Sequence, residues 1–220
     1  MHTVPISDQI HLLGLGCGGS YTAEHIAKRG AAYVHELHGY DGDVVDQSNT
    51  KSQTYLPRHV NMKKVDALAE QVAEWGSISL IRHPAHVEKP IPLSGYVFLA
   101  VDSMETRMRI YEESIENNDA IKLMIEMRLE TTGALIHVID PTNVVHKKKW
   151  RHYWNPDSEA TNGGSCGAEV SMGPIASLTA SVCVWQMVRD AHRRMRGLHD
   201  RIDTQIRINM VPLRIETFQW

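Results

Sequence analysis

The 220-residue chain lacks the features that mark several specialised protein classes. It has no run of about eighteen apolar residues, so we expect no transmembrane helix. It does not open with a basic stretch followed by a long apolar segment, so we expect no secretory signal. Its three cysteines are too few for a disulfide framework or a four-thiolate zinc site. We therefore expect a cytoplasmic protein.

The chain also lacks a strong charge of either sign. A net charge of −3 argues against a surface devoted to nucleic acid or to a membrane. No internal repeat or low-complexity segment is visible. An apolar share of 42% suffices for a core, and the length fits one domain over residues 1–220.

Strand-like and helix-like segments alternate along the sequence. The apolar runs predict strands at residues 10–15, 33–38, 77–82, 96–101, 121–127, 134–139 and within 204–218. Helical spacing predicts helices at residues 20–30, 62–75, 104–115 and from 173 onward, and residues 141–167 are predicted to be a polar loop. This alternation predicts an α/β fold, a Rossmann-like and mostly parallel sheet flanked by helices, with a C-terminal strand extension. The core is expected within residues 10–190.

A glycine-rich turn follows the first predicted strand. Gly14-x-Gly16-x-x-Gly19, with Gly18 inside it, precedes a helix expected to begin at Ser20. Such a turn lets the backbone approach a phosphate, and the helix N-terminus adds free N–H groups. The carboxylates of the segment from Asp41 to Asp43, about twenty residues later, suit a ribose hydroxyl. Together these features predict a nucleotide site; the alternative is a tight strand–helix turn without a ligand.

Polar residues continue beyond the first carboxylate. Residues 41–49 hold three carboxylates and Asn49, which could reach a metal ion or a water facing a phosphate; the alternative is a solvated acidic turn. Lys63 and Lys64 open the next predicted helix, where a positive charge is poorly matched to the helix dipole. A nearby phosphate would explain them, and ordinary surface lysines are the alternative.

Asp102 follows the apolar run 96–101 and so ends a predicted central strand. Open parallel sheets bind ligands at this edge, where a carboxylate suits Mg²⁺. Arg107 lies one helical turn further on. The alternative for Asp102 is a plain N-cap of the following helix, and the two roles are compatible.

Cys166 is the best candidate nucleophile among the cysteines. It lies in Gly-Gly-Ser-Cys-Gly before a predicted helix, where glycines give access and the helix dipole lowers a thiol pKa. The alternative is an incidental loop cysteine. We expect Cys17 and Cys183 to be packed in the interior.

Two further patterns carry weaker signals. Residues 147–154 mix basic and aromatic side chains and could contact nucleic acid or an acidic protein, although a mobile solvated loop is the favoured interpretation. His83-x-x-His86 could chelate a metal but lacks an obvious third ligand, so we discount it.

Taken in order, these motifs resemble the ThiF/MoeB/HesA family, the adenylation fold of ubiquitin-activating enzymes, over roughly residues 10–190. Gly14–Ser20 is similar to the family's glycine turn. The segment from Asp41 to Gln53 is similar to its Asp-x-Asp-x-Val-Glu-x-Ser-Asn-Leu-x-Arg-Gln pattern. Lys64 falls on its phosphate lysine, and residues 102–107 fall on its Asp-Asn-x-x-x-Arg. Residues 166–174 resemble its late cysteine before a Gly-Pro helix.

The resemblance implies an adenylyltransferase that uses ATP and Mg²⁺. Its substrate would be the C-terminal carboxylate of a ubiquitin-like protein, a sulfur-carrier protein or a peptide, and its product an acyl-adenylate. The nucleotide-binding residues implied are Gly14, Gly16, Gly18, Gly19, Asp41, Asp43, Asn49, Gln53 and Lys64. The implied catalytic residues are Asp102, which would hold Mg²⁺, Lys64, Arg107 and Cys166, which would take up the acyl group or deliver sulfur. A homodimer is also implied.

The sequence departs from the family pattern at one charged position. The motif arginine is replaced by Ser52, and Lys51 or Arg58 could supply the charge. The N-terminal arginine segment and the paired Cys-x-x-Cys zinc ligands of some members are also absent. A minimal enzyme, an enzyme completed by a partner and a nucleotide-binding member without catalysis therefore remain open. An NAD- or FAD-dependent oxidoreductase is a further alternative, against which Lys64 favours a triphosphate.

Overall fold

A single mixed sheet of eight strands organises the molecule. The computed structural model describes residues 6–29, 34–76, 78–153, 172–198 and 201–220. The strand order is β3-β2-β1-β4-β5-β6-β7-β8. The strands are β1 (Ile6–Leu13), β2 (Val34–Tyr40), β3 (Leu80–His83), β4 (Gly95–Leu99), β5 (Ile121–Glu130), β6 (Gly133–Ile139), β7 (Gln205–Met210) and β8 (Leu213–Phe218).

The sheet has a parallel half and an antiparallel half. Strands β1 to β5 pair in parallel, and β5 to β8 pair antiparallel. The prediction of a Rossmann-like sheet with a C-terminal strand extension is confirmed. Parallel pairing requires crossovers, and helices supply them, so the carboxyl ends of the parallel strands share one edge of the sheet.

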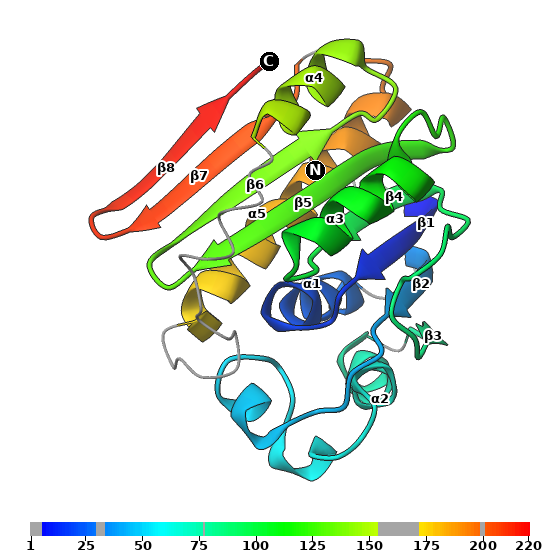
Figure 1. The fold of residues 1–220 in the computed structure, drawn as a ribbon, viewed down its shortest axis with the longest axis vertical. Helices are drawn as coiled ribbons and strands as arrows, with labels where there is room; N and C mark the ends of the chain where they lie inside the picture. Colours follow the sequence, from blue (N-terminus) through cyan, green and yellow to red (C-terminus); the bar gives the residue numbers. More distant parts are fainter. Residues whose placement is uncertain (1–5, 30–33, 77, 154–171, 199–200) are drawn as a thin grey trace.

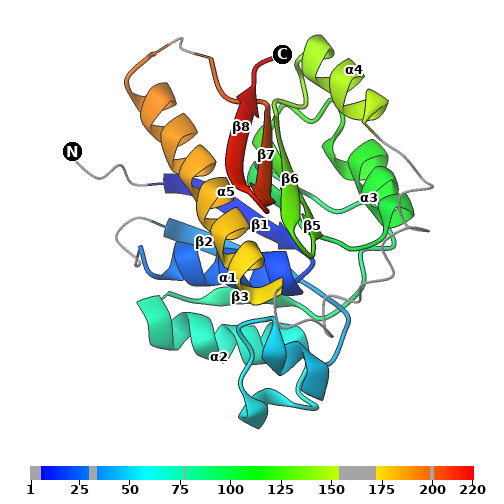
Figure 2. The same cartoon turned by 90° about the vertical axis from the view of Figure 1, so that its left-hand side faces the viewer.

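Helices cover both faces of the sheet. They are α1 (Cys17–Ala27), α2 (Lys64–Gly76), α3 (Met104–Ile110), α4 (Val144–His152) and α5 (Met172–Met195), with short turns η1 (Gln47–Lys51), η2 (Pro57–His59) and a π-helical turn η3 (Tyr111–Ile115). Figure 1 shows α3 and α4 in front of the sheet, and Figure 2 shows α1, α2 and α5 on the opposite face. Each layer buries its own apolar cluster against the sheet, one including Phe98 and the other Trp150.

The predicted loop over residues 141–167 is wrong in its first part, which forms α4. The Asn143 side chain caps this helix by accepting hydrogen bonds from the backbone N–H groups of Val145 and His146, at 2.9 and 3.2 Å. Its inner face is narrow, with His146 and Trp150 buried one helical turn apart. Three consecutive lysines obscure this spacing in the sequence. The remainder of the predicted loop lies outside the described residues.

The helix also changes the interpretation of the basic and aromatic stretch. Trp150 is fully buried, so its ring belongs to the core and not to a nucleic-acid surface. Arg151 pairs with Glu112 at 3.0 Å and with Glu116 at 2.8 Å.

Within the described parts of the chain, no helix is long and apolar enough to cross a bilayer.

A row of histidines lies across β1, β2 and β3. The rings of His11 and His38 stack with centroids 4.6 Å apart, and those of His38 and His83 stack at 5.4 Å. His11 Nδ1 lies 3.2 Å from the Tyr40 hydroxyl. Burial, reinforced by the positive charges that His38 and His83 can carry, lowers the pKa of His11 to about 4, although Glu36 acts in the opposite direction.

Acid should therefore destabilise the fold through His11. Its folded-state pKa of about 4 lies below the ordinary value of 6.5, so the folded state binds fewer protons between these values. The contribution of His11 to the free energy of unfolding is complete above pH 6.5. It is lost as the pH falls toward 4, which lowers the free energy of unfolding by about 2–3 kcal/mol. Urea denaturation over this pH range should show a shallower dependence for His11→Gln than for the wild type. The control is His152→Gln, at an exposed position on α4; equal slopes for His11→Gln and the wild type would contradict this account.

Candidate functional site

Several of the predicted site residues lie where three parallel strands end. Strand β1 lies between β2 and β4, and their carboxyl ends lead into the glycine turn, the Asp41 segment and the Asp102 turn. The Gly14 N–H donates to the Tyr40 carbonyl at 3.0 Å, and the Ala100 N–H donates to the Leu13 carbonyl at 2.8 Å. These bonds tie the three strand ends together at the edge where open parallel sheets bind ligands.

The four glycines of the turn have different roles. Gly14 has φ +88°, and a Cβ there would lie 2.8 Å from the Ala100 carbonyl oxygen. A Cβ at Gly18 would clash with the Met127 side chain, and one at Gly19 would clash with the Gly14 carbonyl. At Gly16 a Cβ would meet nothing within 4 Å. Three glycines therefore permit close packing, and Gly16 borders open space into which a ligand could enter.

Helix α1 begins at Cys17, earlier than the predicted start at Ser20, so the turn leads directly into the helix. The Ser20 side chain accepts a hydrogen bond from the Thr54 N–H at 3.3 Å, and the Tyr55 hydroxyl donates to the Leu15 carbonyl at 2.8 Å. The segment after the acidic residues is thereby anchored to the glycine turn. Tyr55 was not among the predicted site residues, because nothing in its local sequence indicates that its partner lies forty residues away.

Backbone N–H groups orient the Asp41 carboxylate. Its Oδ2 accepts from the Leu15 N–H at 2.8 Å, and its Oδ1 accepts from the Asp43 N–H at 2.9 Å. The Asp41 side chain is mostly buried. It is therefore held at the end of β2 beside the glycine turn, in the position of a ribose acceptor in a nucleotide-binding βαβ unit.

Lys64 faces both carboxylates of the acidic segment. Its Nζ donates to Asp43 Oδ2 at 2.7 Å and lies 3.8 Å from Asp41 Oδ2. Burial would raise the pKa of Asp43, but the hydrogen bond and charge of Lys64 outweigh it and lower that pKa. Lys63 points elsewhere, donating to the Gly42 carbonyl at 2.9 Å. Lys64 thus lies beside Asp41, which is bonded to the glycine turn, and its predicted contact with a phosphate remains a prediction.

Asn49 and Gln53 lie in the connection that follows. The Asn49 side-chain oxygen accepts from the Asp46 N–H at 2.9 Å, and Asp46 in turn accepts from the Ser48 N–H at 2.8 Å. This reciprocal pair caps η1. Gln53 is buried. The predicted nucleotide contacts of Asn49 and Gln53 remain predictions.

Asp102 lies exposed in the turn between β4 and α3. Its Oδ1 accepts from the Ser103 N–H at 2.8 Å. The N-cap of α3 is Ser103, whose hydroxyl accepts from the Thr106 N–H at 3.1 Å, so the capping alternative for Asp102 is wrong. The Asp102 carboxylate instead faces solvent at the ligand-binding edge.

Arg107 points into the protein interior. Its guanidinium donates to the carbonyls of Leu99 and Met127, both at 3.2 Å, and to that of Val101. It also pairs with Glu126 at 3.1 Å. These contacts hold the turn that carries Asp102. Its predicted catalytic role remains a prediction, and the contacts are those of a positioning residue.

The position of the missing motif arginine is closed to solvent. Ser52 is buried, and the Cys17 thiol donates to its hydroxyl at 3.7 Å. Arg58, one suggested substitute, instead pairs with Glu74 at 3.1 Å, while Lys51 is exposed. Cys17 and Cys183 are both buried, as predicted. Cys166 lies outside the described residues.

The donor set at Asp102 fits magnesium better than a metal held by protein ligands alone. Among the residues that the structure describes, no group of three or more His, Cys, Asp or Glu side chains could hold a metal ion. Mg²⁺ in phosphate-transfer sites commonly takes one or two carboxylates and completes its shell with water and substrate phosphates. Asp102 presents one exposed carboxylate and Gly16 borders open space, which agrees with that pattern.

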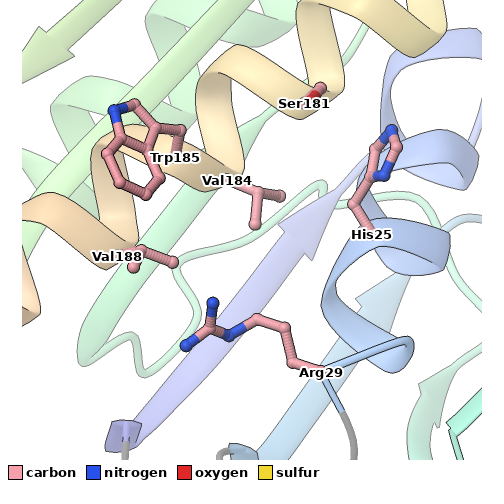
Figure 3. A pocket seen from close by; sticks show the side chains of 6 residues that line it. All are labelled: His25, Arg29, Ser181, Val184, Trp185 and Val188. Carbon is pink, nitrogen blue, oxygen red and sulfur yellow. The ribbon is translucent and has the colours of Figure 1, made fainter. Parts of the chain in front are cut away.

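A separate hollow lies between α1 and α5 (Figure 3). It is lined by His25, Arg29, Ser181, Val184, Trp185 and Val188. His25 Nε2 lies 3.2 Å from the Ser177 carbonyl oxygen, which joins the two helices beside it. Of the predicted site residues that the structure describes, none lines this hollow.

Comparison with known proteins identifies the family. The model of the ThiF family matches residues 7–202. The chain belongs to the ThiF family. A comparison with curated proteins found no match.

Solved structures share the fold of this ThiF-family chain. Escherichia coli MccB with ATP is similar with a TM-score of 0.73 and 12% identity, over 97% of this chain and 64% of that one. E. coli MccB with AMPCPP and selenomethionine MccA has a TM-score of 0.69 and 13% identity, over 96% of this chain and 63% of that one. Selenomethionine PaaA has a TM-score of 0.67 and 17% identity, over 96% of this chain and 63% of that one. The chain therefore spans less than two thirds of the length of these relatives.

The glycine turn gives a test of which of its glycines is needed for close packing. Gly19→Ala forces a Cβ against the Gly14 carbonyl and should reduce the free energy of unfolding by about 1–3 kcal/mol. Gly16→Ala adds a methyl group in open space and should change it by less than about 1 kcal/mol. Urea denaturation measures both. Equal losses of stability in the two variants would contradict the different roles of these glycines.

Proposed function

We propose that this chain is an ATP-dependent adenylyltransferase that activates the C-terminal carboxylate of a peptide or of a small ubiquitin-like or sulfur-carrier protein. The observation that carries the proposal is the arrangement of Gly16, Asp41 and Lys64 at the ends of β1 and β2 in a ThiF-family chain. The structures of MccB with ATP, and with AMPCPP and MccA, support it by their shared fold.

The described residues divide the work of holding the nucleotide. Asp41, preoriented by two backbone N–H groups, accepts hydrogen bonds from the ribose hydroxyls. Gly16 lets the phosphates approach the start of α1, whose free N–H groups and dipole favour negative charge. Lys64 neutralises phosphate charge, and Asp43 keeps its ammonium group beside the glycine turn.

The reaction is a displacement at phosphorus. An oxygen of the substrate carboxylate forms a bond to the α-phosphorus, and the bond from that phosphorus to the oxygen bridging the α- and β-phosphates breaks, so pyrophosphate leaves. Two anions must meet, so catalysis rests on neutralising charge and orienting the carboxylate. Asp102 would hold Mg²⁺, which supplies part of that neutralisation when bound. Cys166 would act afterwards: its thiolate would attack the carbonyl carbon of the acyl-adenylate and form a thioester as AMP leaves, or a persulfide on it, loaded by a sulfur donor, would attack the same carbon with AMP as the leaving group.

One observation favours a second candidate, a nucleotide-binding family member without catalysis. The motif arginine is replaced by the buried Ser52, and Arg58 is paired with Glu74. Among the described residues, Lys64 is therefore the cation on which phosphate neutralisation would chiefly depend. An enzyme in which a partner supplies the missing charge, including a second copy in the expected homodimer, is consistent with the same observation.

Calorimetric titration of ATP in the presence of Mg²⁺, with NAD as competitor, tests the proposed function. Wild-type protein should bind ATP, and Asp102→Ala should weaken Mg²⁺-dependent binding by about tenfold or more, equivalent to about 1.4 kcal/mol. The control is Asp119→Ala, which removes an exposed carboxylate just before β5, at the opposite edge of the sheet.

The outcomes separate the candidate functions. Preference for NAD over ATP would contradict the adenylyltransferase and favour the oxidoreductase alternative. The protein could bind ATP in a metal-dependent way and yet catalyse no ATP–pyrophosphate exchange when peptides with a free C-terminal carboxylate are added. That result would favour a nucleotide-binding family member without catalysis. Equal affinities for Asp102→Ala and the wild type would remove Asp102 as the magnesium ligand.

A further inference from the structure

A buried carboxylate on β5 lies at the centre of a polar cluster. Glu126 is 0% exposed. Its Oε1 lies 3.1 Å from Arg107 Nη1 in an ion pair and accepts a hydrogen bond from Arg128 Nε at 2.6 Å. Its Oε2 lies 2.5 Å from His137 Nδ1 and accepts from Trp150 Nε1 at 3.0 Å. Each oxygen thus has two nitrogen partners, which is the condition under which an ionised group is tolerated in the interior.

The cluster favours the ionised form of Glu126. Burial alone would raise its pKa, but the charges of Arg107 and Arg128, together with His137, outweigh burial and lower that pKa well below the ordinary value. Gln205 Nε2 lies 3.1 Å from His137 Nε2. The Gln205 side chain thus contacts His137 through the ring nitrogen that does not face Glu126.

Arg107 connects Glu126 to the turn that bears Asp102. Its guanidinium donates to the carbonyl of Leu99, the last residue of β4, and to that of Val101, which immediately precedes Asp102. A third bond reaches the carbonyl of Met127 on β5 at 3.2 Å. One rigid planar group therefore joins the end of β4 to β5, and the ion pair with Glu126 through Nη1 helps to fix its orientation.

Arg128 connects the same carboxylate to a second part of the chain. Its Nη1 donates to the Tyr153 carbonyl at 3.0 Å, just beyond the end of α4. The Tyr153 ring stacks on that of Trp220, with centroids 5.7 Å apart and planes 9° from parallel. Glu126 therefore joins the Asp102 turn, α4 and the C-terminal segment in one network.

We propose that Glu126 is a positioning residue for the nucleotide and metal site, acting through Arg107 on the turn that carries Asp102. The inference rests on the proposed function, because it assigns Asp102 to Mg²⁺. Without the negative charge of Glu126, the Arg107 guanidinium loses the partner that orients it, and the carbonyls of Leu99 and Val101 lose a fixed donor. Asp102 would then no longer be held in the one orientation that suits the metal and the phosphates.

Asp190 on α5 provides a matched control for burial and charge. It is also 0% exposed and pairs with Arg193 and Arg194, both at 2.6 Å, and with the Tyr96 hydroxyl at 3.1 Å. Its partners lie on α5 and near the amino end of β4, away from the Asp102 turn. Removing its charge disturbs an ion-pair cluster of the same kind without touching that turn.

The test is ATP titration of the full chain at a series of Mg²⁺ concentrations, by calorimetry, with circular dichroism confirming that each variant is folded. For Glu126→Gln we expect unchanged ATP affinity without Mg²⁺ and a rise of about 10- to 100-fold in the Mg²⁺ concentration that half-restores tight binding. Asp190→Asn should keep the wild-type Mg²⁺ requirement even if its melting temperature falls. A folded Glu126→Gln with the wild-type requirement would overturn the proposal, as would an equal rise in Asp190→Asn.

A second variant covers the case in which Glu126→Gln does not fold. Arg107→Lys can still pair with Glu126, but its single ammonium group cannot bridge the carbonyls of Leu99, Val101 and Met127. Arg107→Lys should likewise raise the Mg²⁺ concentration that half-restores tight ATP binding, and an unchanged concentration would overturn the positioning role.

Absence of ATP binding by the wild type, or an unchanged Mg²⁺ requirement in Asp102→Ala, would overturn the proposed site together with this inference. Normal Asp102 dependence with no effect of Glu126→Gln would overturn the inference alone.

Discussion

The site depends on the close approach of Gly14 to the Ala100 carbonyl, at a place where a Cβ would lie 2.8 Å from that oxygen. Because no side chain separates them, β1 and β4 end side by side and α1 begins immediately after the turn. The strands flanking β1 then carry Asp41 on one side and lead to Asp102 on the other. The packing of this one glycine therefore helps to set how the ends of β1 and β4 are arranged, and with them the turns on which the proposed site depends.

Three carboxylates of this molecule illustrate how environment assigns different tasks to one functional group. Asp41 accepts two backbone hydrogen bonds and is held still. Asp102 is exposed and bonded to the adjacent N–H, which leaves it accessible to a cation. Glu126 is enclosed by two arginines, a histidine and a tryptophan, so it serves the structure around it. The proposed adenylylation chemistry uses all three, one for the sugar, one for the metal and one for positioning.

Local spacing predicted the elements whose signals lie within a few residues of one another. The strand before Gly14, the glycine turn and the following helix occupy one short stretch, and the apolar run before Asp102 is continuous, as expected for a strand covered on both faces. Helix α4 was missed because its buried stripe is limited to His146 and Trp150, with three lysines between them. An N-cap role was the alternative interpretation of Asp102, because aspartate and serine are both good caps, and only the backbone path shows that Ser103 takes this position.

By itself the sequence determined the α/β class, the position of the glycine turn and the placement of Asp41 and Asp102 after two parallel strands, because parallel strands bring their carboxyl ends to one edge whatever the detail of the packing. Only the tertiary structure decided that Ser52 is enclosed, that Arg107 points inward and that Glu126 links the Asp102 turn to α4 and the C-terminal segment. The donors to Glu126 come from α3, β5, β6 and α4. Such a cluster leaves no periodic trace along the chain, since its members meet only when the sheet and the helix layer have packed.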